Sequence, residues 1–259
     1  MRSETVTSAQ NPKIRNLLLL QEKSKARREQ GLFVVEGLRE LQHCIGAGFR
    51  VNTLFVCPEV AGEVDLPAGQ VIEIPAALYR KVAYREGTEG VIAEVEYRER
   101  KLEDIPLGKD PLVVVLESVE KPGNLGAVLR SADAARADAV LICDPLTDLF
   151  NPNLIRASLG GVFTVPTVCT TSEDAVAWLR ANGIRILTAQ LQDSSWYYDT
   201  DMTRGTALVM GTESTGLTPL WREAADAHIR IPMLGRLDSL NVSVSAAVLL
   251  FEAVRQRHL

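Results

Sequence analysis

The amino-acid sequence predicts an α/β protein with two regions, a small N-terminal α/β region and a larger region built on a mostly parallel sheet. In the larger region, short apolar strand patterns alternate with helix patterns, which is typical of a parallel sheet covered by helices. Between the regions lies a charged segment, "RERKLEDIPLGKD", interrupted by Pro106 and Gly108. We therefore expect an N-terminal domain over residues 1–98, a linker over 99–110 and a C-terminal domain over 111–259.

In the first region, four apolar segments have the length and composition of strands: "LFVVEG", "VNTLFVCP", "QVIEIP" and "GVIAEVEY", at residues 32–37, 51–58, 70–75 and 90–97. The segment 38–48 between the first two predicts a helix that ends at glycine. An earlier helix carries a basic cluster, Lys13, Arg15, Lys23, Lys25, Arg27 and Arg28. This pattern alone favours a solvated helix face, although it also suits contact with phosphates.

In the second region, "PLVVVLES" at 111–118 is continuously apolar, as expected for a strand covered on both faces. A helix is predicted over 125–137, followed by a strand at 139–144 and the helix 172–183. Short strands are expected at 165–168, 184–190, 206–211 and within 229–235, before an apolar C-terminal helix.

The bulk composition excludes several classes of protein. The net charge of −5 argues against a surface that is basic throughout, although a local basic patch remains compatible with it. The four cysteines and three histidines are scattered and form no metal-binding spacing. The first residues lack the apolar core of a signal peptide, so we expect a cytoplasmic protein with free thiols and without a metal or membrane partner.

The loop "VEKPGNLGAVLR" contains the first group of candidate functional residues. Asn124 is placed to cap the helix that follows. Arg130 points away from the apolar stripe of that helix, and two interpretations are equally supported: a surface pair with Asp133, or a grip on a phosphate or ribose. The loop lacks the GxGxxG spacing of a dinucleotide-binding fold, which disfavours an oxidoreductase.

Two further loops have a similar mixture of glycine and polar residues. In "LVMGTESTGLTPLW", Gly211 and Gly216 flank Glu213, and Thr218 with Pro219 predicts a helix start. Capping explains Thr218 and leaves Glu213 without a role. In "RLDSLNVSVS", capping of the last helix explains Ser239 or Asn241 but not both.

Together these loops resemble the three motifs of the TrmH-like (SpoU) branch of the SPOUT RNA methyltransferases. The matching parts are Asn124 with Arg130, the "GTESTGL" loop, and "IPM" followed by "SLNVSV". The resemblance covers residues 111–259, and "NPNLIRASLGGVFTVP" at 151–166 is similar to the segment between motifs. Residues 1–100 resemble a ribosomal-protein-like RNA-binding domain, which favours RNA contact for the basic cluster.

The resemblance implies a deep trefoil knot in the C-terminal domain and a homodimer with its sites near the subunit interface. It implies S-adenosylmethionine as the cofactor, held through backbone groups of Gly211, Ile231 and Leu240. It also implies a catalytic set of five residues, in which four orient the ribose and Arg130: Arg130, Asn124, Glu213, Ser239 and Asn241. A guanidinium offers only donors, so Arg130 suits binding of the substrate phosphate or the developing alkoxide better than proton removal.

The implied activity is S-adenosylmethionine-dependent methylation of an RNA ribose 2′-hydroxyl, with ribosomal RNA favoured over transfer RNA. A non-catalytic RNA-binding or ribosome assembly factor is the further alternative. Arg136 stands where the family commonly has glycine, and the sequence leaves its role open. The sequence also leaves open which nucleotide and base are methylated.

Overall fold

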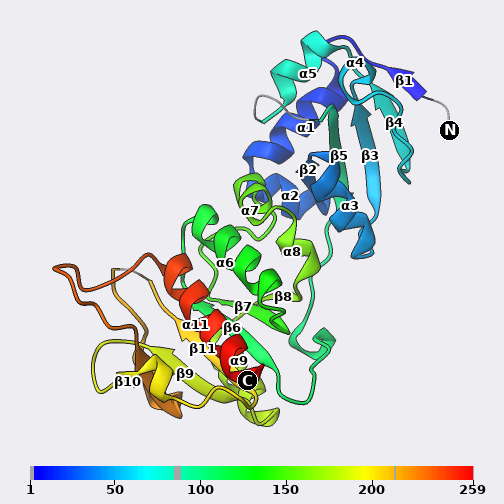
Figure 1. Cartoon of the computed structure of the whole chain (residues 1–259). Helices are drawn as coiled ribbons and strands as arrows, with labels where there is room; N and C mark the ends of the chain where they lie inside the picture. The colour runs from blue at the N-terminus through cyan, green and yellow to red at the C-terminus, as the bar shows by residue number, and fades with distance from the viewer. Residues whose placement is uncertain (1–2, 85–88, 213, 259) are drawn as a thin grey trace. The chain divides into compact units, whose positions relative to one another are not determined.

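The computed structural model describes residues 3–84, 89–212 and 214–258 (Figure 1). The chain divides into two compact units. The first unit comprises residues 1–98 and 150–164, and the second comprises residues 99–149 and 165–259.

The first unit contains a five-stranded mixed sheet in the order β1-β4-β3-β5-β2. Its strands are β1 (Ser3–Thr5), β2 (Leu32–Glu36), β3 (Val51–Val56), β4 (Gln70–Glu73) and β5 (Val91–Glu96). β5 runs antiparallel to β2 and β3, whereas β3 and β1 run parallel to β4. The four expected strands are confirmed, and β1 is an additional edge strand.

Helices cover this sheet: α1 (Pro12–Glu22), α2 (Ser24–Gln30), α3 (Leu38–Gly46), α4 (Pro58–Ala61), α5 (Ala76–Val82), α7 (Pro152–Ser158) and α8 (Gly161–Thr164). α1 begins where Asn11 accepts a hydrogen bond from the Lys13 N–H at 2.9 Å and Pro12 occupies the first turn. The buried side chains of α1, including Ile14, Leu17 and Leu20, pack into one core with Phe55.

Residues 150–164 cluster with the first unit, whereas the sequence predicts them within the domain 111–259. Aromatic packing explains the difference. The Phe150 ring stacks on Phe33 of β2 with centroids 4.1 Å apart, and Phe163 lies 5.5 Å from Phe49 in an edge-to-face pair.

The second unit contains a seven-stranded sheet in the order β10-β12-β9-β11-β6-β7-β8. Its strands are β6 (Leu112–Glu117), β7 (Ala139–Cys143), β8 (Thr167–Thr170), β9 (Arg185–Ala189), β10 (Ser195–Trp196), β11 (Thr206–Met210) and β12 (Ala227–Arg230). All neighbouring pairs are parallel, which confirms the predicted parallel sheet. β10 was not expected, and β8 begins two residues after the predicted start.

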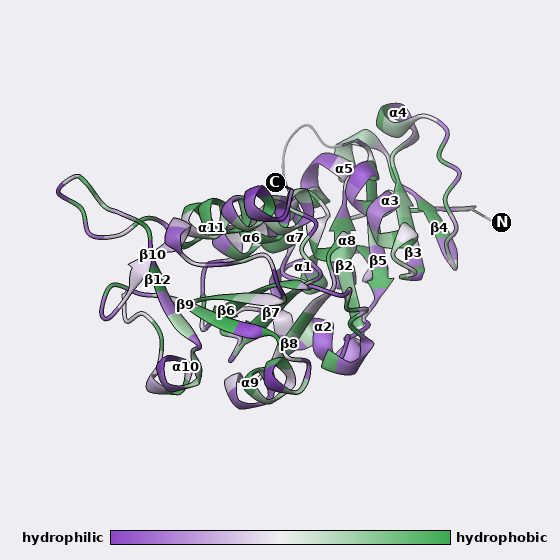
Figure 2. Ribbon diagram, turned by 60° about the horizontal axis from the view of Figure 1, so that its bottom comes forward, coloured by the Kyte–Doolittle hydropathy of each residue, from purple (hydrophilic) through white to green (hydrophobic). Residues whose placement is uncertain are grey.

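Two pairs of helices cover opposite faces of this sheet (Figure 2). On one face lie α6 (Pro122–Ala134) and α11 (Val242–Arg257), and on the other lie α9 (Ser172–Ala181) and α10 (Pro219–Ala224). Short 3₁₀ turns occupy Leu102–Asp104 and Tyr197–Asp199. The strands β6, β7 and β11 are buried throughout, as their continuous apolar sequences predict.

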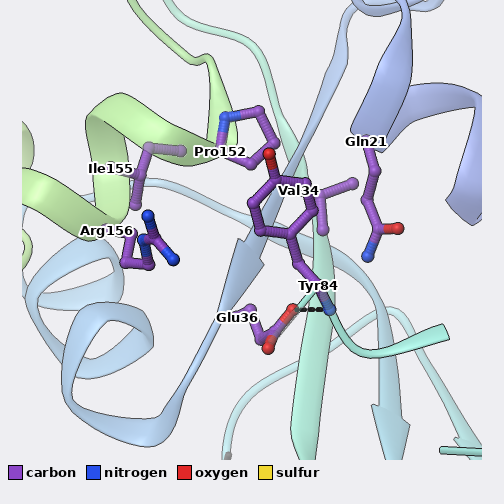
Figure 3. Close-up of a pocket in the computed structure, with 7 residues that line it drawn as sticks. All are labelled: Gln21, Val34, Glu36, Tyr84, Pro152, Ile155 and Arg156. Atoms are coloured by element: carbon purple, nitrogen blue, oxygen red, sulfur yellow. Dashed lines mark hydrogen bonds between the residues drawn. The ribbon is translucent and has the colours of Figure 1, made fainter. Parts of the chain in front are cut away.

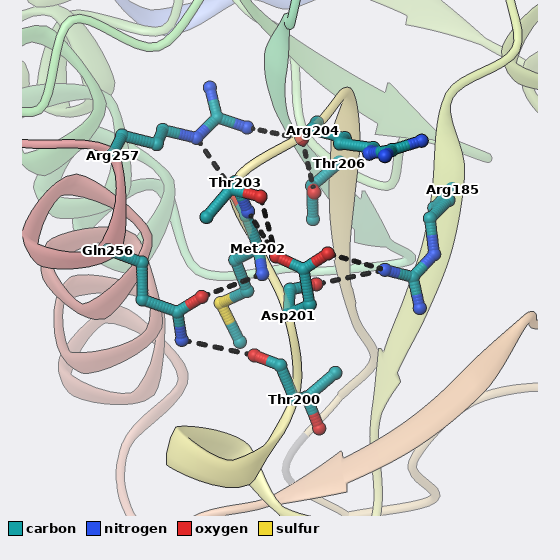
Figure 4. Close-up of polar contacts among 9 residues, drawn as sticks. All are labelled: Arg185, Thr200, Asp201, Met202, Thr203, Arg204, Thr206, Gln256 and Arg257. Atoms are coloured by element: carbon teal, nitrogen blue, oxygen red, sulfur yellow. Dashed lines mark hydrogen bonds and ion pairs between the residues drawn. The ribbon is translucent and has the colours of Figure 1, made fainter.

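The end of α11 fixes the segment that leads into β11 (Figure 4). The Gln256 side chain donates to the Thr200 carbonyl at 3.0 Å and accepts from the Met202 N–H at 2.8 Å. Arg257 donates to the carbonyls of Met202 and Arg204 at 2.9 and 2.7 Å.

Among the helices of the described residues, none combines the length and apolarity that crossing a bilayer requires.

Candidate functional site

A cavity of about 340 Å³ lies in the second unit where the loops after β9, β11 and β12 meet. The three strands are parallel, so their carboxyl ends share one edge of the sheet, the usual place for a ligand in such folds. Three of the predicted binding residues, Gly211, Ile231 and Leu240, line this cavity together with Ser239. The structure therefore brings together residues that are far apart in sequence.

The wall of the cavity at Gly211 consists of backbone atoms. A Cβ atom added to Gly211 would lie 2.3 Å from the carbonyl oxygen of Gly216, which leaves no room for any side chain. Gly216 has a positive φ of 69°, and its N–H donates to the Thr212 carbonyl at 3.0 Å. Gly211 is thus required by the close approach of the two ends of this loop, and Gly216 by its positive φ.

In the third loop, Ser239 and Asn241 have different roles. Asn241 caps α11, because its side-chain oxygen accepts from the Ser243 N–H at 3.0 Å and from the Ser243 hydroxyl at 2.6 Å. Ser239 is exposed, lines the cavity, and donates a hydrogen bond to Asp238 at 3.3 Å. Capping therefore accounts for Asn241 only.

Asn124 also contacts the third loop. Its side-chain oxygen accepts a hydrogen bond from the Asn241 amide at 3.2 Å. The expectation that Asn124 caps the helix is wrong, because α6 begins at Pro122 with Lys121 as its cap residue. Proline favours the first helical position, so the helix starts earlier and Asn124 lies within its first turn.

The two arginines of the first motif region are both exposed. Arg130 lies on α6, and it is not among the residues that line the cavity. Arg136 follows α6 with a φ of 52°, a left-handed conformation that glycine adopts without strain. This conformation gives a physical reason for the glycine that the family commonly has there. Glu213, the remaining predicted catalytic residue, falls outside the described residues.

The basic cluster of the first unit divides into surface residues and one buried residue. Arg15, Lys23, Lys25 and Arg28 are exposed, whereas Lys13 is half-buried and pairs with Glu4. The expectation that Arg27 contacts RNA is wrong. Arg27 is 1% exposed, and its guanidinium donates to the carbonyls of Leu20 and Gln21 at 2.6 and 3.2 Å. The guanidinium thus satisfies carbonyls at the end of α1.

Sequence reasoning missed Glu117 at the end of β6. Its carboxylate accepts hydrogen bonds from the Thr218 N–H at 2.9 Å and from the Thr218 hydroxyl at 2.6 Å. Thr218 is the cap residue of α10, but its hydroxyl bonds to Glu117 and does not cap the helix. The signal available in the sequence was a glutamate at the end of an otherwise apolar strand.

Other chemical candidates are weaker. A second cavity, in the first unit, contains Glu36, Tyr84 and Arg156 but has only about 20 Å³, room for about one water molecule (Figure 3). No cluster of three metal-binding side chains occurs within residues 3–84, 89–212 and 214–258. The four cysteines are free, and burial raises the pKa of Cys44 to about 12, which keeps that thiol protonated and unreactive.

Two family models match this chain. The sequence model described as the SpoU rRNA Methylase family matches residues 111–251, and the MRM3-like substrate binding domain matches residues 11–93. A 23S rRNA (uridine(2479)-2′-O)-methyltransferase of Streptomyces viridochromogenes is 32% identical over 89% of this chain and 85% of its own length. The 23S rRNA (guanosine(2553)-2′-O)-methyltransferase RlmP of Bacillus subtilis is 29% identical over 95% of this chain and 97% of its own length.

Solved structures show the same similarity over nearly the whole chain. An rRNA methyltransferase from Sinorhizobium meliloti, crystallised with AdoMet, superposes with a TM-score of 0.88. It is 32% identical, and the match covers 99% of this chain and 98% of that one. An RNA 2′-O ribose methyltransferase superposes with a TM-score of 0.84 at 38% identity, over 98% of this chain and all of that one.

Proposed function

The chain belongs to the SpoU rRNA methylase family, and on that premise we propose that it methylates a ribose 2′-hydroxyl of ribosomal RNA with S-adenosylmethionine as donor. The observation that carries the proposal is the cavity in which Gly211, Ile231, Leu240 and Ser239 meet. Relatives named as 23S rRNA 2′-O-methyltransferases, and the AdoMet-bound S. meliloti structure, support it.

The cavity fits the cofactor. Its volume lies within the range of small-molecule sites. Apolar side chains such as Leu191, Met210 and Leu217 supply surface for a purine, and the backbone at Gly211 approaches closely enough to bind one. When bound, S-adenosylmethionine supplies a methyl group on a positively charged sulfur, a reactive electrophile.

The polar residues around this cavity have separate tasks in the proposal. The hydrogen bond between Asn124 and Asn241 fixes α6 to the start of α11, so that both asparagines form one surface beside the cavity. Ser239, exposed at the cavity, orients the acceptor ribose. Arg130 binds the substrate phosphate or the oxygen as it loses its proton, because a fixed positive charge stabilises a developing alkoxide. Glu213 retains its predicted role as a residue that orients the ribose.

The first unit binds the RNA substrate in this proposal. Its match to the MRM3-like substrate binding domain supports that role, as do the exposed cations Arg15, Lys23, Lys25 and Arg28. Lys13 adds a further cation, and its pairing with Glu4, like that of Lys25 with Glu29, reduces the free charge. Binding through such cations weakens as salt concentration rises, because phosphate contacts release counterions.

Three further features belong to the same proposal. The second unit forms a trefoil knot and the domain boundary lies at residues 99–110. The fold similarity to solved family members supports the knot.

The protein is a homodimer. Leu234 and Leu237 are 95% and 76% exposed, and Val244 and Phe251 add apolar surface on α11 that a second copy would cover. The ribosomal RNA substrate implies a cytoplasmic location.

Mapping of 2′-O-methyl groups in total RNA tests the activity directly. RNA from cells with and without the gene is compared at every position, and purified protein with S-adenosylmethionine is then added to the unmethylated RNA. We expect loss of one methylated ribose in ribosomal RNA and its restoration by the protein. If the missing methyl group lies in transfer RNA, the proposed substrate is wrong. If no methyl group is missing, the proposal is overturned. Sedimentation equilibrium checks the dimer.

A further inference from the structure

We propose that Glu117 is a positioning residue that holds the loop after β11 in the shape that binds the cofactor. The inference rests on the proposed function and concerns a residue that does not line the cavity. Glu117 acts through Thr218, which follows the cavity-lining residues Gly216 and Leu217 directly in the chain.

Glu117 makes a well-defined contact. It is the last residue of β6 and is 2% exposed, so water cannot solvate its carboxylate. One oxygen accepts the Thr218 N–H at 2.9 Å and the other accepts the Thr218 hydroxyl at 2.6 Å. Hydrogen bonds to a carboxylate are shorter and stronger than neutral ones, and the two bonds together fix the position of Thr218.

Thr218 supplies the two shorter hydrogen bonds that the Glu117 carboxylate accepts. Within the part of the chain that the structure describes, no lysine or arginine forms an ion pair with Glu117. The Ser172 hydroxyl lies 3.5 Å away, but it donates a much shorter bond to Asp144 at 2.6 Å. A buried carboxylate without enough donors is costly, which favours the arrangement that keeps Thr218 in place.

The position of Thr218 determines the wall of the cavity. Only Leu217, itself buried, separates Thr218 from Gly216. The Gly216 carbonyl oxygen lies so close to Gly211 that no side chain fits between them. A shift of Thr218 therefore moves the Gly216 backbone against Gly211 and changes the cavity on which cofactor binding depends.

A neighbouring network anchors α10 at Trp221, three residues after Thr218. Trp221, fully buried in α10, donates its indole N–H to the Ser172 hydroxyl at 2.9 Å, and Ser172 in turn bonds to Asp144 at the end of β7. α10 is therefore anchored at two points to the ends of adjacent strands. Of these two anchors, the bond to Glu117 is the one that adjoins the cavity loop.

The substitution Thr218→Val tests the inference with a side chain of nearly the same shape. It removes the hydroxyl and keeps the backbone N–H. Isothermal titration calorimetry with S-adenosylmethionine and with S-adenosylhomocysteine measures binding, and RNA affinity is measured separately. We expect a dissociation constant for both cofactor forms about tenfold above wild type, with RNA affinity unchanged. Thr218→Ser restores the hydroxyl and is expected to recover most of the lost affinity.

A stability control distinguishes positioning from a general loss of folding. Leu179→Ala empties a fully buried site on α9 in the same core, and it contacts neither Glu117 nor the loop after β11 through a hydrogen bond. We expect Leu179→Ala to lower the melting temperature more than Thr218→Val does while leaving cofactor affinity within twofold of wild type. Glu117→Gln, which keeps the shape and one acceptor, should weaken cofactor binding by a few fold.

The outcomes separate the inference from the proposed function. Wild-type protein that fails to bind S-adenosylmethionine overturns both. Wild-type protein that binds it, with Thr218→Val binding within twofold, overturns the role of Glu117 alone. If cofactor affinity falls in proportion to the decrease in melting temperature in every variant, including Leu179→Ala, the role of Glu117 is also overturned.

Discussion

The two units build their sheets differently, and the difference determines where polar chemistry gathers. In the second unit all seven strands are parallel, so the loops after β9, β11 and β12 leave the same edge and form one cavity. In the first unit β5 runs against both of its neighbours, so loops leave the sheet at both edges. The parallel sheet of the second unit thus brings distant segments together in one site. In the first unit, the proposed contacts with RNA come from the helices and not from the strand ends.

Buried charges follow the same contrast. In the first unit, Arg27 is buried to satisfy backbone carbonyls, and Glu94 on β5 is buried at 6% exposure beside Asn16. Arg27 thus supports the end of α1, and Glu94 joins β5 to α1, away from any ligand cavity described above. In the second unit, Glu117 joins residues 101 positions apart in sequence at the edge where the cavity forms. Buried polar groups in the second unit therefore connect the loops of the proposed site.

The largest effect is expected from Arg130→Ala. If the second unit performs the chemistry, loss of this guanidinium should lower turnover by about 1,000-fold, since charge stabilisation in the transition state is lost. Cofactor affinity should stay within a few fold of wild type, because Arg130 does not line the cavity. Single-turnover methylation assays and calorimetry measure the two quantities.

Arg136→Gly is the matched control for Arg130→Ala, because it also removes an exposed guanidinium near α6 and suits the positive φ at that position. We expect it to keep its turnover. Near-normal methylation by Arg130→Ala would remove Arg130 from the mechanism.

A substitution at Gly211 tests whether backbone atoms form the cofactor site. Gly211→Ala places a Cβ 2.3 Å from the Gly216 carbonyl, so the loop must move, and we expect cofactor affinity to fall by about 100-fold, or about 2.7 kcal/mol. Gly46→Ala, in the first unit, introduces a Cβ with no atom within 4 Å and should leave cofactor affinity unchanged. Equal affinities for the two variants would show that this wall does not contact the cofactor.

Adjacent arginines in the first unit allow the structural and RNA-binding roles to be separated. Arg27→Met should lower the free energy of unfolding by about 3 kcal/mol, because it leaves buried carbonyls without donors. Arg28→Ala should leave stability unchanged and weaken RNA binding by a few fold, with a smaller salt dependence. Denaturant unfolding and RNA titrations at two salt concentrations provide the measurements. Weaker RNA binding by a fully stable Arg27→Met would restore Arg27 as a contact.

The smallest effect concerns pH. Burial raises the pKa of Glu94 above its ordinary value of 4.5, so the folded protein binds this proton more tightly than the unfolded chain does. Stability from this residue is therefore greatest below pH 4.5 and decreases as pH rises through the raised pKa. Glu94→Gln removes the titration and should melt a few °C higher than wild type at pH 7. At pH 4 the two proteins should melt alike, and an unchanged difference at both pH values would contradict the assignment.

Much of the fold could be predicted from sequence because it depends on local patterns. The continuously apolar segment at 112–116 and the repeated strand and helix patterns indicate the parallel sheet. The two-residue strand β10 carries too short a pattern to detect. The assignment of residues 150–164 depends on Phe150 and Phe163 packing against Phe33 and Phe49, which no local pattern encodes.

The candidate site was predictable where a motif marks it and unpredictable where distant residues meet. Gly211, Ile231, Leu240 and Ser239 were expected together and do line one cavity. Thr218 reads as a helix cap in sequence, because its actual partner Glu117 lies 101 residues away. Arg27 and Arg28 are identical in type and adjacent, and only the end of α1 decides which of them is buried.

The glycine wall of the cavity has a consequence for inhibition. Resistance to an inhibitor commonly arises when a side chain that contacts it is replaced. A compound that hydrogen-bonds to the backbone around Gly211 and Gly216 would depend on atoms that every residue possesses. A Cβ atom added at Gly211 collides with the backbone on the opposite side of the loop. A substitution there that prevents the inhibitor from binding should therefore also inactivate the protein.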